Sequence, residues 1–151
     1  MKVFYLAMIA SLASIGPPVS ANSSGELDGQ AIICADAIYP IALIGGNYFH
    51  DGQVFYHQPH RDGQKAIIKQ WKQANAYQVN PNTIEWRNAD NLSVLNRNTL
   101  RLELFPMTGK SVWQAWQCEF MESLPAYERA LEEARVGLQE RINKRIAEGK
   151  S

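Results

Sequence analysis

Apolar and polar residues alternate at every second position in several short stretches of the chain, most clearly in residues 99–105. Leu100, Leu102 and Leu104 fall on one side of this stretch, and charged residues stand between them. A period of two is typical of a β-strand that buries one face. Comparable stretches, separated by turn residues, recur over residues 31–122 and predict an antiparallel meander.

Glycine-containing turns shape the first part of this meander. Asp51-Gly52 is a tight hairpin signal between two apolar stretches. The Gly45-Gly46 pair interrupts the stretch just before this hairpin. Glycine inside a strand weakens it and often marks a distortion, so the pair predicts a β-bulge or a sharp bend.

One segment, residues 65–77, fits two different periods. Ile67, Trp71 and Ala74 match a helical stripe, whereas Ile67, Lys69 and Trp71 match one face of a strand. Both spacings are compatible with a buried face, and periodicity alone leaves both open. We favour the strand, because it continues the pattern of the neighbouring stretches.

The period changes to three and four residues near Ser123, which predicts a helix. Ser123 is suited to an N-cap position and Pro125 to the first turn. The predicted helix spans residues 125–147, with charged residues on the face opposite its apolar stripe. That stripe consists of Leu124, Tyr127, Leu131, Ala134, Leu138, Ile142 and Ile146.

These patterns predict a mainly β fold with one long C-terminal helix. The strands form an antiparallel meander that closes, or half closes, into a small barrel when the first strand meets the last. The predicted organisation is a signal peptide (1–21), a polar leader (22–30), the β meander (31–122) and an amphipathic helix of the same domain (123–151).

The N-terminus has the features of a secretory signal. Lys2 precedes an apolar run at residues 3–15, and Val19-Ser20-Ala21 offers small residues for cleavage near Ala21. The run is shorter than the roughly 20 residues that a membrane span needs. We therefore expect a periplasmic or secreted protein whose mature chain has no transmembrane segment.

The cysteine content agrees with export. After cleavage, Cys34 and Cys118 are the cysteines of the chain. An even number of cysteines in an oxidising compartment predicts a disulfide, here between the first and the last strand. Two buried free thiols are the alternative.

The charge balance points away from nucleic acid. The full chain has 15 basic and 15 acidic residues, and losing Lys2 leaves 15 − 1 = 14 basic residues and a formal charge of −1. A basic patch is the usual sign of a nucleic-acid or anionic-membrane partner. We therefore expect no nucleic-acid partner, and the sequence has no cofactor-binding signature.

The histidines are the candidates for a metal site. His50, His57 and His60 lie on both sides of the predicted hairpin. Three or four converging ligands of this type would hold zinc or copper. The alternative is a set of surface histidines on a polar hairpin, because their spacing matches no known ligand motif.

Aromatic residues are the candidates for a ligand cavity. Trp86, Trp116 and Tyr77 fall in predicted strands. In a barrel that leaves space inside, such rings would line a small-molecule site. The alternative is that they fill the core, since aromatic side chains supply much of the buried area of small β domains.

The chain resembles a group of small exported bacterial proteins of unknown function. The resemblance rests on Cys34, Ile84-Glu85-Trp86, residues 95–100, Trp116-Gln117-Cys118 and Asn143-Lys144. It implies export, one disulfide and a β-rich domain, and it implies no activity. The long charged helix departs from the shorter tail of that group.

No stretch carries a catalytic signature such as the Gly-x-Ser-x-Gly elbow of serine hydrolases. We therefore expect a non-enzymatic binding or envelope-associated protein whose partner is a protein or an envelope component. A carrier with a barrel-like interior for small apolar ligands is the first alternative. A small hydrolase is the second.

Overall fold

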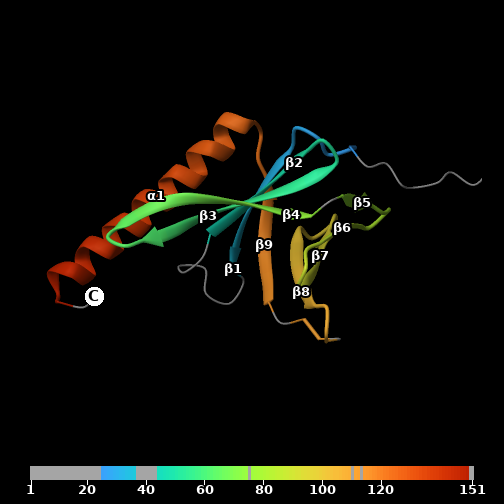
Figure 1. Cartoon of the computed structure of the whole chain (residues 1–151). Coiled ribbons are helices and arrows are strands. Elements are labelled where there is room, and N and C mark those ends of the chain that lie inside the picture. Colours follow the sequence, from blue (N-terminus) through green and yellow to red (C-terminus); the bar gives the residue numbers. More distant parts are fainter. Residues whose placement is uncertain (1–24, 37–43, 75, 110, 113, 150–151) are drawn as a thin grey trace, which may run out of the picture.

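The computed structural model describes residues 25–36, 44–74, 76–109, 111–112 and 114–149. The predicted signal peptide, residues 1–21, lies outside the described residues. The described part contains one antiparallel sheet and one long helix, which confirms the predicted mainly β class with a C-terminal helix (Figure 1).

The sheet has nine strands in the order β4-β3-β2-β1-β9-β8-β7-β6-β5. Each half of the chain therefore forms its own run of hairpins, and the two runs meet where β1 pairs with β9. The strands are β1 (Ala31–Asp36), β2 (Ile44–His50), β3 (Gln53–Asp62), β4 (Lys65–Ala74), β5 (Tyr77–Val79), β6 (Thr83–Arg87), β7 (Asn91–Asn96), β8 (Arg101–Pro106) and β9 (Gln114–Phe120).

The sheet coils but does not close. The predicted contact between the first and last strands is present, yet β4 and β5 stay at opposite edges of the sheet although only two residues separate them in sequence. The N–H group of Tyr77 donates to the carbonyl oxygen of Gly52 (3.2 Å), so β5 begins against the β2–β3 turn rather than along β4. The sheet is therefore not closed, and the predicted closed or half-closed barrel is not confirmed.

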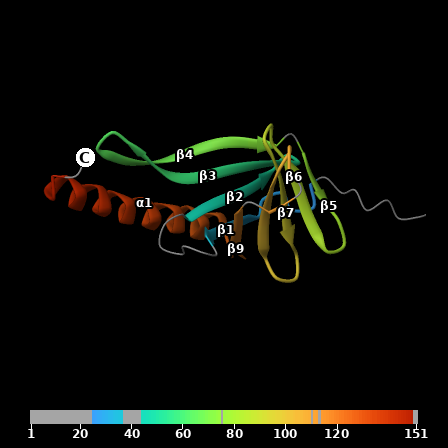
Figure 2. The ribbon, with the colours of Figure 1, turned by 90° about the horizontal axis from the view of Figure 1, so that it is seen from below.

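The ambiguous segment is a strand for most of its length, as favoured. Lys65–Ala74 forms β4, which pairs with β3 into a long hairpin that extends away from the other strands (Figure 2). The strand ends before Tyr77, which belongs to β5.

The two faces of the sheet have different roles. Ile32 and Cys34 of β1 point to the inner face, where most of the buried apolar side chains collect. Ala31 and Ile33, at the alternate positions, point to the outer face and meet the helix. This division follows from the two-residue period of a strand.

Helix α1 (Leu124–Ala147) lies across the outer faces of β1–β4. The Ser123 hydroxyl accepts from the N–H group of Ala126 (3.3 Å), which confirms the predicted N-cap. Tyr127, Leu131 and Ile142 are buried, whereas the predicted stripe residues at both ends, Leu124 and Ile146, are exposed. The helix is thus part of the fold along most of its length.

Side chains of α1 also cover part of the β4 edge. Gln139 Oε1 accepts from the N–H group of Ala66 (2.7 Å), and Arg135 Nη1 donates to the Ala66 carbonyl oxygen (3.3 Å). Unpaired backbone groups on an edge strand can pair with another chain. The helix therefore blocks strand addition at this point of the edge.

The Gly45-Gly46 pair is neither a bulge nor a bend. The register of β1 against β2 runs without a break through both glycines, and the irregularity lies at Val54/Phe55 of β3 instead. A Cβ atom on Gly45 would lie 2.6 Å from the Tyr56 hydroxyl oxygen, and one on Gly46 would lie 2.6 Å from that of Tyr127. The glycines make room for one tyrosine ring on each face.

The predicted polar leader is partly built into the domain. Leu27 is buried in the inner core, and its N–H group donates to the Tyr77 hydroxyl oxygen (2.9 Å). The same hydroxyl donates to Asp28 Oδ1 (2.9 Å), and Asp28 Oδ1 also accepts from the N–H group of Gly52 (3.0 Å). This segment thus ties β5 to the β2–β3 turn.

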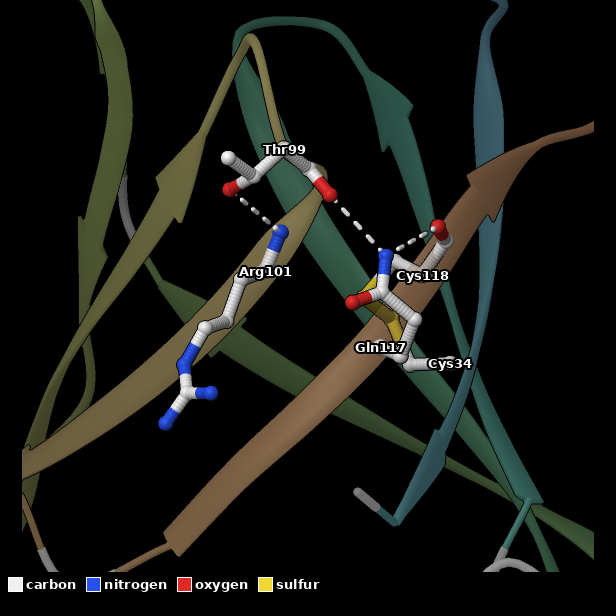
Figure 3. The surroundings of a disulfide bond; sticks show 5 residues. All are labelled: Cys34, Thr99, Arg101, Gln117 and Cys118. Carbon is white, nitrogen blue, oxygen red and sulfur yellow. Dashed lines mark hydrogen bonds between the residues drawn. A yellow bond between two sulfur atoms is a disulfide. The ribbon is translucent and has the colours of Figure 1, made fainter.

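The disulfide between Cys34 and Cys118 is present and links the two central strands (Figure 3). The cysteines stand directly opposite each other, with α-carbons 4.0 Å apart. The Cys118 N–H group donates to the carbonyl oxygen of Leu100, just before β8 on the other side of β9 (2.9 Å), so the cysteines form a non-hydrogen-bonded pair of the β1–β9 ladder. Beside the bridge, Gln117 Nε2 donates to the Thr99 carbonyl oxygen (2.9 Å).

Replacing both cysteines with alanine should lower the free energy of unfolding by about 4 kcal/mol, because the bridge closes a long loop in the unfolded chain. The two cysteines are 84 positions apart. Urea denaturation followed by circular dichroism measures the loss, and reduction of the wild-type protein should reproduce it. A loss below about 1 kcal/mol would contradict this view of the β1–β9 pair.

Gly46→Ala should destabilise the fold by about 1–3 kcal/mol, because the added methyl group clashes with the ring of Tyr127. Gly137→Ala is the matched control. Its Cβ atom would meet only Arg141 Nη1 at 3.7 Å, and alanine favours a helix by about 1 kcal/mol. Thermal melts should therefore shift in opposite directions. A Tyr127→Leu background should remove most of the cost of Gly46→Ala.

Candidate ligand-binding site

A cavity of about 210 Å³ lies on the inner face of the coiled sheet, and both halves of the chain contribute to it. We call it the inner cavity. Its polar lining comes from uncharged side chains. These are Asn47, Tyr56 and Gln58 from β2 and β3, and Asn88, Asn91, Ser93 and Gln114 from the other half.

Two of these polar residues sit deep inside the fold. Asn47 is 2% exposed and Ser93 is 1% exposed. Each occupies a strand position whose alternate neighbours, such as Phe49 and Leu95, belong to the apolar inner core. Their polar side chains thus stand among apolar core residues and belong to the cavity lining, where a bound molecule could hydrogen-bond to them.

The predicted aromatic candidates divide between cavity and core. Trp86 and Trp116 line the inner cavity, together with Leu102, Leu104 and the bridged Cys34. Tyr77 belongs to the buried core, and its hydroxyl is occupied by Leu27 and Asp28. Tyr77 is therefore a structural residue at this end of the sheet.

Both tryptophans carry an unpartnered hydrogen-bond donor. The Nε1 atoms of Trp86 and Trp116 are buried, and neither has a hydrogen-bond partner in the described structure. An orphaned buried donor costs about 1–3 kcal/mol. A ligand oxygen that reaches these N–H groups as the rings adjust would recover part of this cost.

The inner cavity holds no ionised side chain among its described lining residues. Burial raises the pKa of Tyr56 to about 12, so its hydroxyl stays protonated at neutral pH. Buried Asp36 lies outside the lining, and its Oδ2 accepts from Gln114 Nε2 at 3.5 Å. The lining therefore offers hydrogen bonds and apolar surface without a formal charge of its own.

An aromatic cluster on β3 and β4 continues the inner face beyond the cavity. Tyr56 stacks on Trp71 with ring centroids 5.7 Å apart, and His60 meets the same indole edge-on at 6.2 Å. Lys69 places its Nζ atom 4.8 Å from the centre of that ring. Tyr56 connects this cluster to the cavity lining.

The three histidines do not come together. His57 faces the helix, whereas His60, three positions along the same strand, faces the opposite side beside Trp71. His50 stacks on Tyr48 and contacts Asp51 near the β2–β3 turn. Within the described ranges, no group of three or more histidine, cysteine or acidic side chains is placed to hold a metal ion.

His57 instead forms part of a groove between α1 and the outer face of the sheet. The groove has a volume of about 430 Å³, and Glu128 and Glu132 line it as well. His57 Nδ1 lies 2.8 Å from the hydroxyl oxygen of Tyr127, and either neutral ring tautomer can make this hydrogen bond. Burial lowers the pKa of His57, although a hydrogen bond with Gln70 acts in the opposite direction.

The sequence patterns did not identify the polar residues of the inner cavity. Asn47 and Ser93 carried a signal, because each places a polar side chain two positions before an inward apolar residue of the same strand, Phe49 and Leu95 respectively. Gln58 and Gln114 carried none, since a polar residue near a strand end is ordinary. Only the coiling of the sheet brings these four residues to one site.

Comparison with family models, with curated proteins and with solved structures finds no match for this chain. The disulfide and the β-rich sheet that the sequence resemblance implied are present. In the part of the chain that the structure describes, no helix combines the length and the apolar character needed to cross a bilayer.

Acidification should weaken the contact between α1 and the sheet at His57. The pKa of His57 is lowered from its ordinary value of 6.5, so the unfolded chain binds a proton at higher pH than the folded one does. The contribution of neutral His57 to the free energy of unfolding is therefore fully present above about pH 6.5. It decreases as the pH falls below that value.

Melting temperatures measured between about pH 5 and pH 8 test this effect. His57→Gln keeps a hydrogen-bonding group beside Tyr127 but cannot titrate, so its melting temperature should fall less on acidification than that of the wild type. His60→Gln, on the other face, should retain the wild-type slope. Equal slopes for all three proteins would show that His57 is not the titrating group.

Proposed function

We propose that this protein is a non-enzymatic binding protein that works outside the cytoplasm and holds a small molecule in the inner cavity. The observation that carries the proposal is the ring of uncharged hydrogen-bonding side chains around the cavity, two of them almost fully buried. Interiors of small coiled sheets are normally filled by apolar side chains. Polar groups held at inward positions favour a ligand that bonds to them.

The chemistry of the lining supports binding rather than catalysis. General acid–base catalysis uses a histidine, a carboxylate or another group whose pKa lies near the working pH. The described lining has no histidine and no carboxylate, and its one tyrosine keeps its proton. Ser93 thus has no base beside it in the lining that would make it a nucleophile.

The disulfide supports a location outside the cytoplasm. Structural disulfides persist in oxidising compartments and are rare in the cytosol of most organisms. The Cys34–Cys118 bridge joins the strands on which the whole sheet depends. This agrees with the signal peptide that the sequence predicts at residues 1–21, and with release of the mature chain near Ala21.

The mixed polar and apolar lining also argues against two alternatives: a carrier of apolar ligands and a binding site for a protein partner. A carrier of purely apolar molecules would leave Asn47 and Ser93 without partners, at about 1–3 kcal/mol for each group. A site for a protein partner would more often be a flat surface than a cavity of about 210 Å³. A small ligand with both polar and apolar parts fits the cavity better than either.

Native mass spectrometry of the protein, exported and purified without denaturation, tests this proposal. Leu104→Phe places a larger side chain in the cavity lining, and should reduce the fraction carrying a retained small molecule by about tenfold. Leu92→Phe is the matched control, because Leu92 lies on the adjacent strand and outside this lining. A ligand retained equally by both variants would overturn the assignment of the cavity.

A further inference from the structure

We infer that the ligand of the inner cavity is a neutral polyhydroxylated molecule the size of one sugar ring. This inference rests on the proposed function and adds the chemical class of the ligand. It follows from four properties of the lining: the kind of hydrogen-bonding group, the flat apolar walls, the charge and the volume.

The first property is the predominance of carboxamide side chains. Five of the polar lining residues are asparagine or glutamine, and each of these side chains has both donor and acceptor groups. A hydroxyl group also donates and accepts. Some of the amide groups are already engaged: Asn88 Oδ1 accepts from the N–H groups of Asp90 and Asn91, and Gln114 Nε2 donates to Asp36. A ligand with several hydroxyl groups can donate to or accept from the remaining amide groups, whereas a ligand with acceptors alone could not donate to the amide oxygens.

The second property is the pair of indole rings. Trp86 and Trp116 contribute apolar atoms to the lining, and their buried Nε1 atoms are donors without acceptors, which a ligand reaches only once the rings adjust. A sugar ring has an apolar C–H face and oxygen atoms at its edge. The C–H face of the sugar can pack on an indole ring, and an edge oxygen can accept from an indole N–H. One ligand can therefore supply both the apolar contact and the hydrogen-bond acceptor.

The third property is the absence of formal charge in the described lining. A charged ligand would lose its hydration in the cavity without an opposite charge to compensate for the loss. Lys69 and His60 lie in the neighbouring aromatic cluster and outside the lining.

The fourth property is size. A volume of 210 Å³ equals roughly seven times the share of one water molecule in the liquid. It lies below the range of about 300–1,000 Å³ that is usual for drug-sized ligands. The cavity therefore takes one hexose ring, and any further unit of a longer chain would lie outside, toward Trp71, which stacks on the lining residue Tyr56.

Saturation-transfer NMR and tryptophan fluorescence titration, both with the full mature protein, test the inference. The neutral probes are glucose, galactose and N-acetylglucosamine, and the comparison probes are glucuronate and laurate. We expect saturation transfer to at least one neutral sugar, a change in tryptophan emission as the indole rings adjust, and no detectable binding of glucuronate.

Two matched pairs of variants locate the binding. Gln58→Leu removes an amide from the lining and should weaken sugar binding about tenfold or more, whereas Gln78→Leu, at an exposed position of β5, should leave it unchanged. Trp116→Phe removes one orphaned indole N–H and should also weaken binding. Trp71→Phe, outside the lining, should not alter binding of a single sugar ring. Thermal melts confirm that each variant folds.

The outcomes separate this inference from the proposed function. Binding of laurate but of no sugar, abolished by Leu104→Phe, would overturn the sugar assignment and leave a small-molecule binding protein. Binding of glucuronate in preference to glucose would also overturn the assignment, because a neutral lining cannot favour the anion. Sugar binding unaffected by both Gln58→Leu and Trp116→Phe would place the site elsewhere and overturn the inference.

Discussion

The β1–β9 ladder is the contact on which the rest of the structure depends. Each half of the chain makes its own hairpins between strands close in sequence, and this ladder alone joins the two halves into one sheet. Closing a long loop costs conformational entropy, and the Cys34–Cys118 bond removes that cost from folding of the oxidised chain. The inner cavity exists only when the ladder forms, because Asn47 and Tyr56 come from one half and Trp86 and Ser93 from the other.

The ladder also determines which face of the sheet lines the inner cavity and which face packs against the helix. Once β1 turns Cys34 inward, its neighbours Ala31 and Ile33 face outward and receive the helix. On β2, Gly45 and Gly46 repeat this division, with Tyr56 packed on the inner side and Tyr127 on the outer side. The helix thus covers the outer face of β1–β4 and leaves the inner face to the cavity.

Local patterns predicted the local features of the fold and failed where distant residues decide. Three local predictions are confirmed: the alternation in β8, the helix after Ser123 and the pairing of the two cysteines. The first two depend on neighbouring residues, and the third depends on an even number of cysteines. Gly45-Gly46 was misread as a distortion because the reason for the glycines is a pair of tyrosine rings from β3 and α1. Likewise the polar residues of the cavity become a site only through the coiling of the sheet.

An apolar filling of the interior would give a more stable protein than the observed one. The two buried indole N–H groups alone cost about 1–3 kcal/mol each without partners, which is large beside a net stability of about 5–15 kcal/mol. Stability is commonly given up where a binding site needs unpaired groups. The two unpartnered indole N–H groups belong to residues that line the inner cavity, and bonding to a ligand there would offset part of that cost.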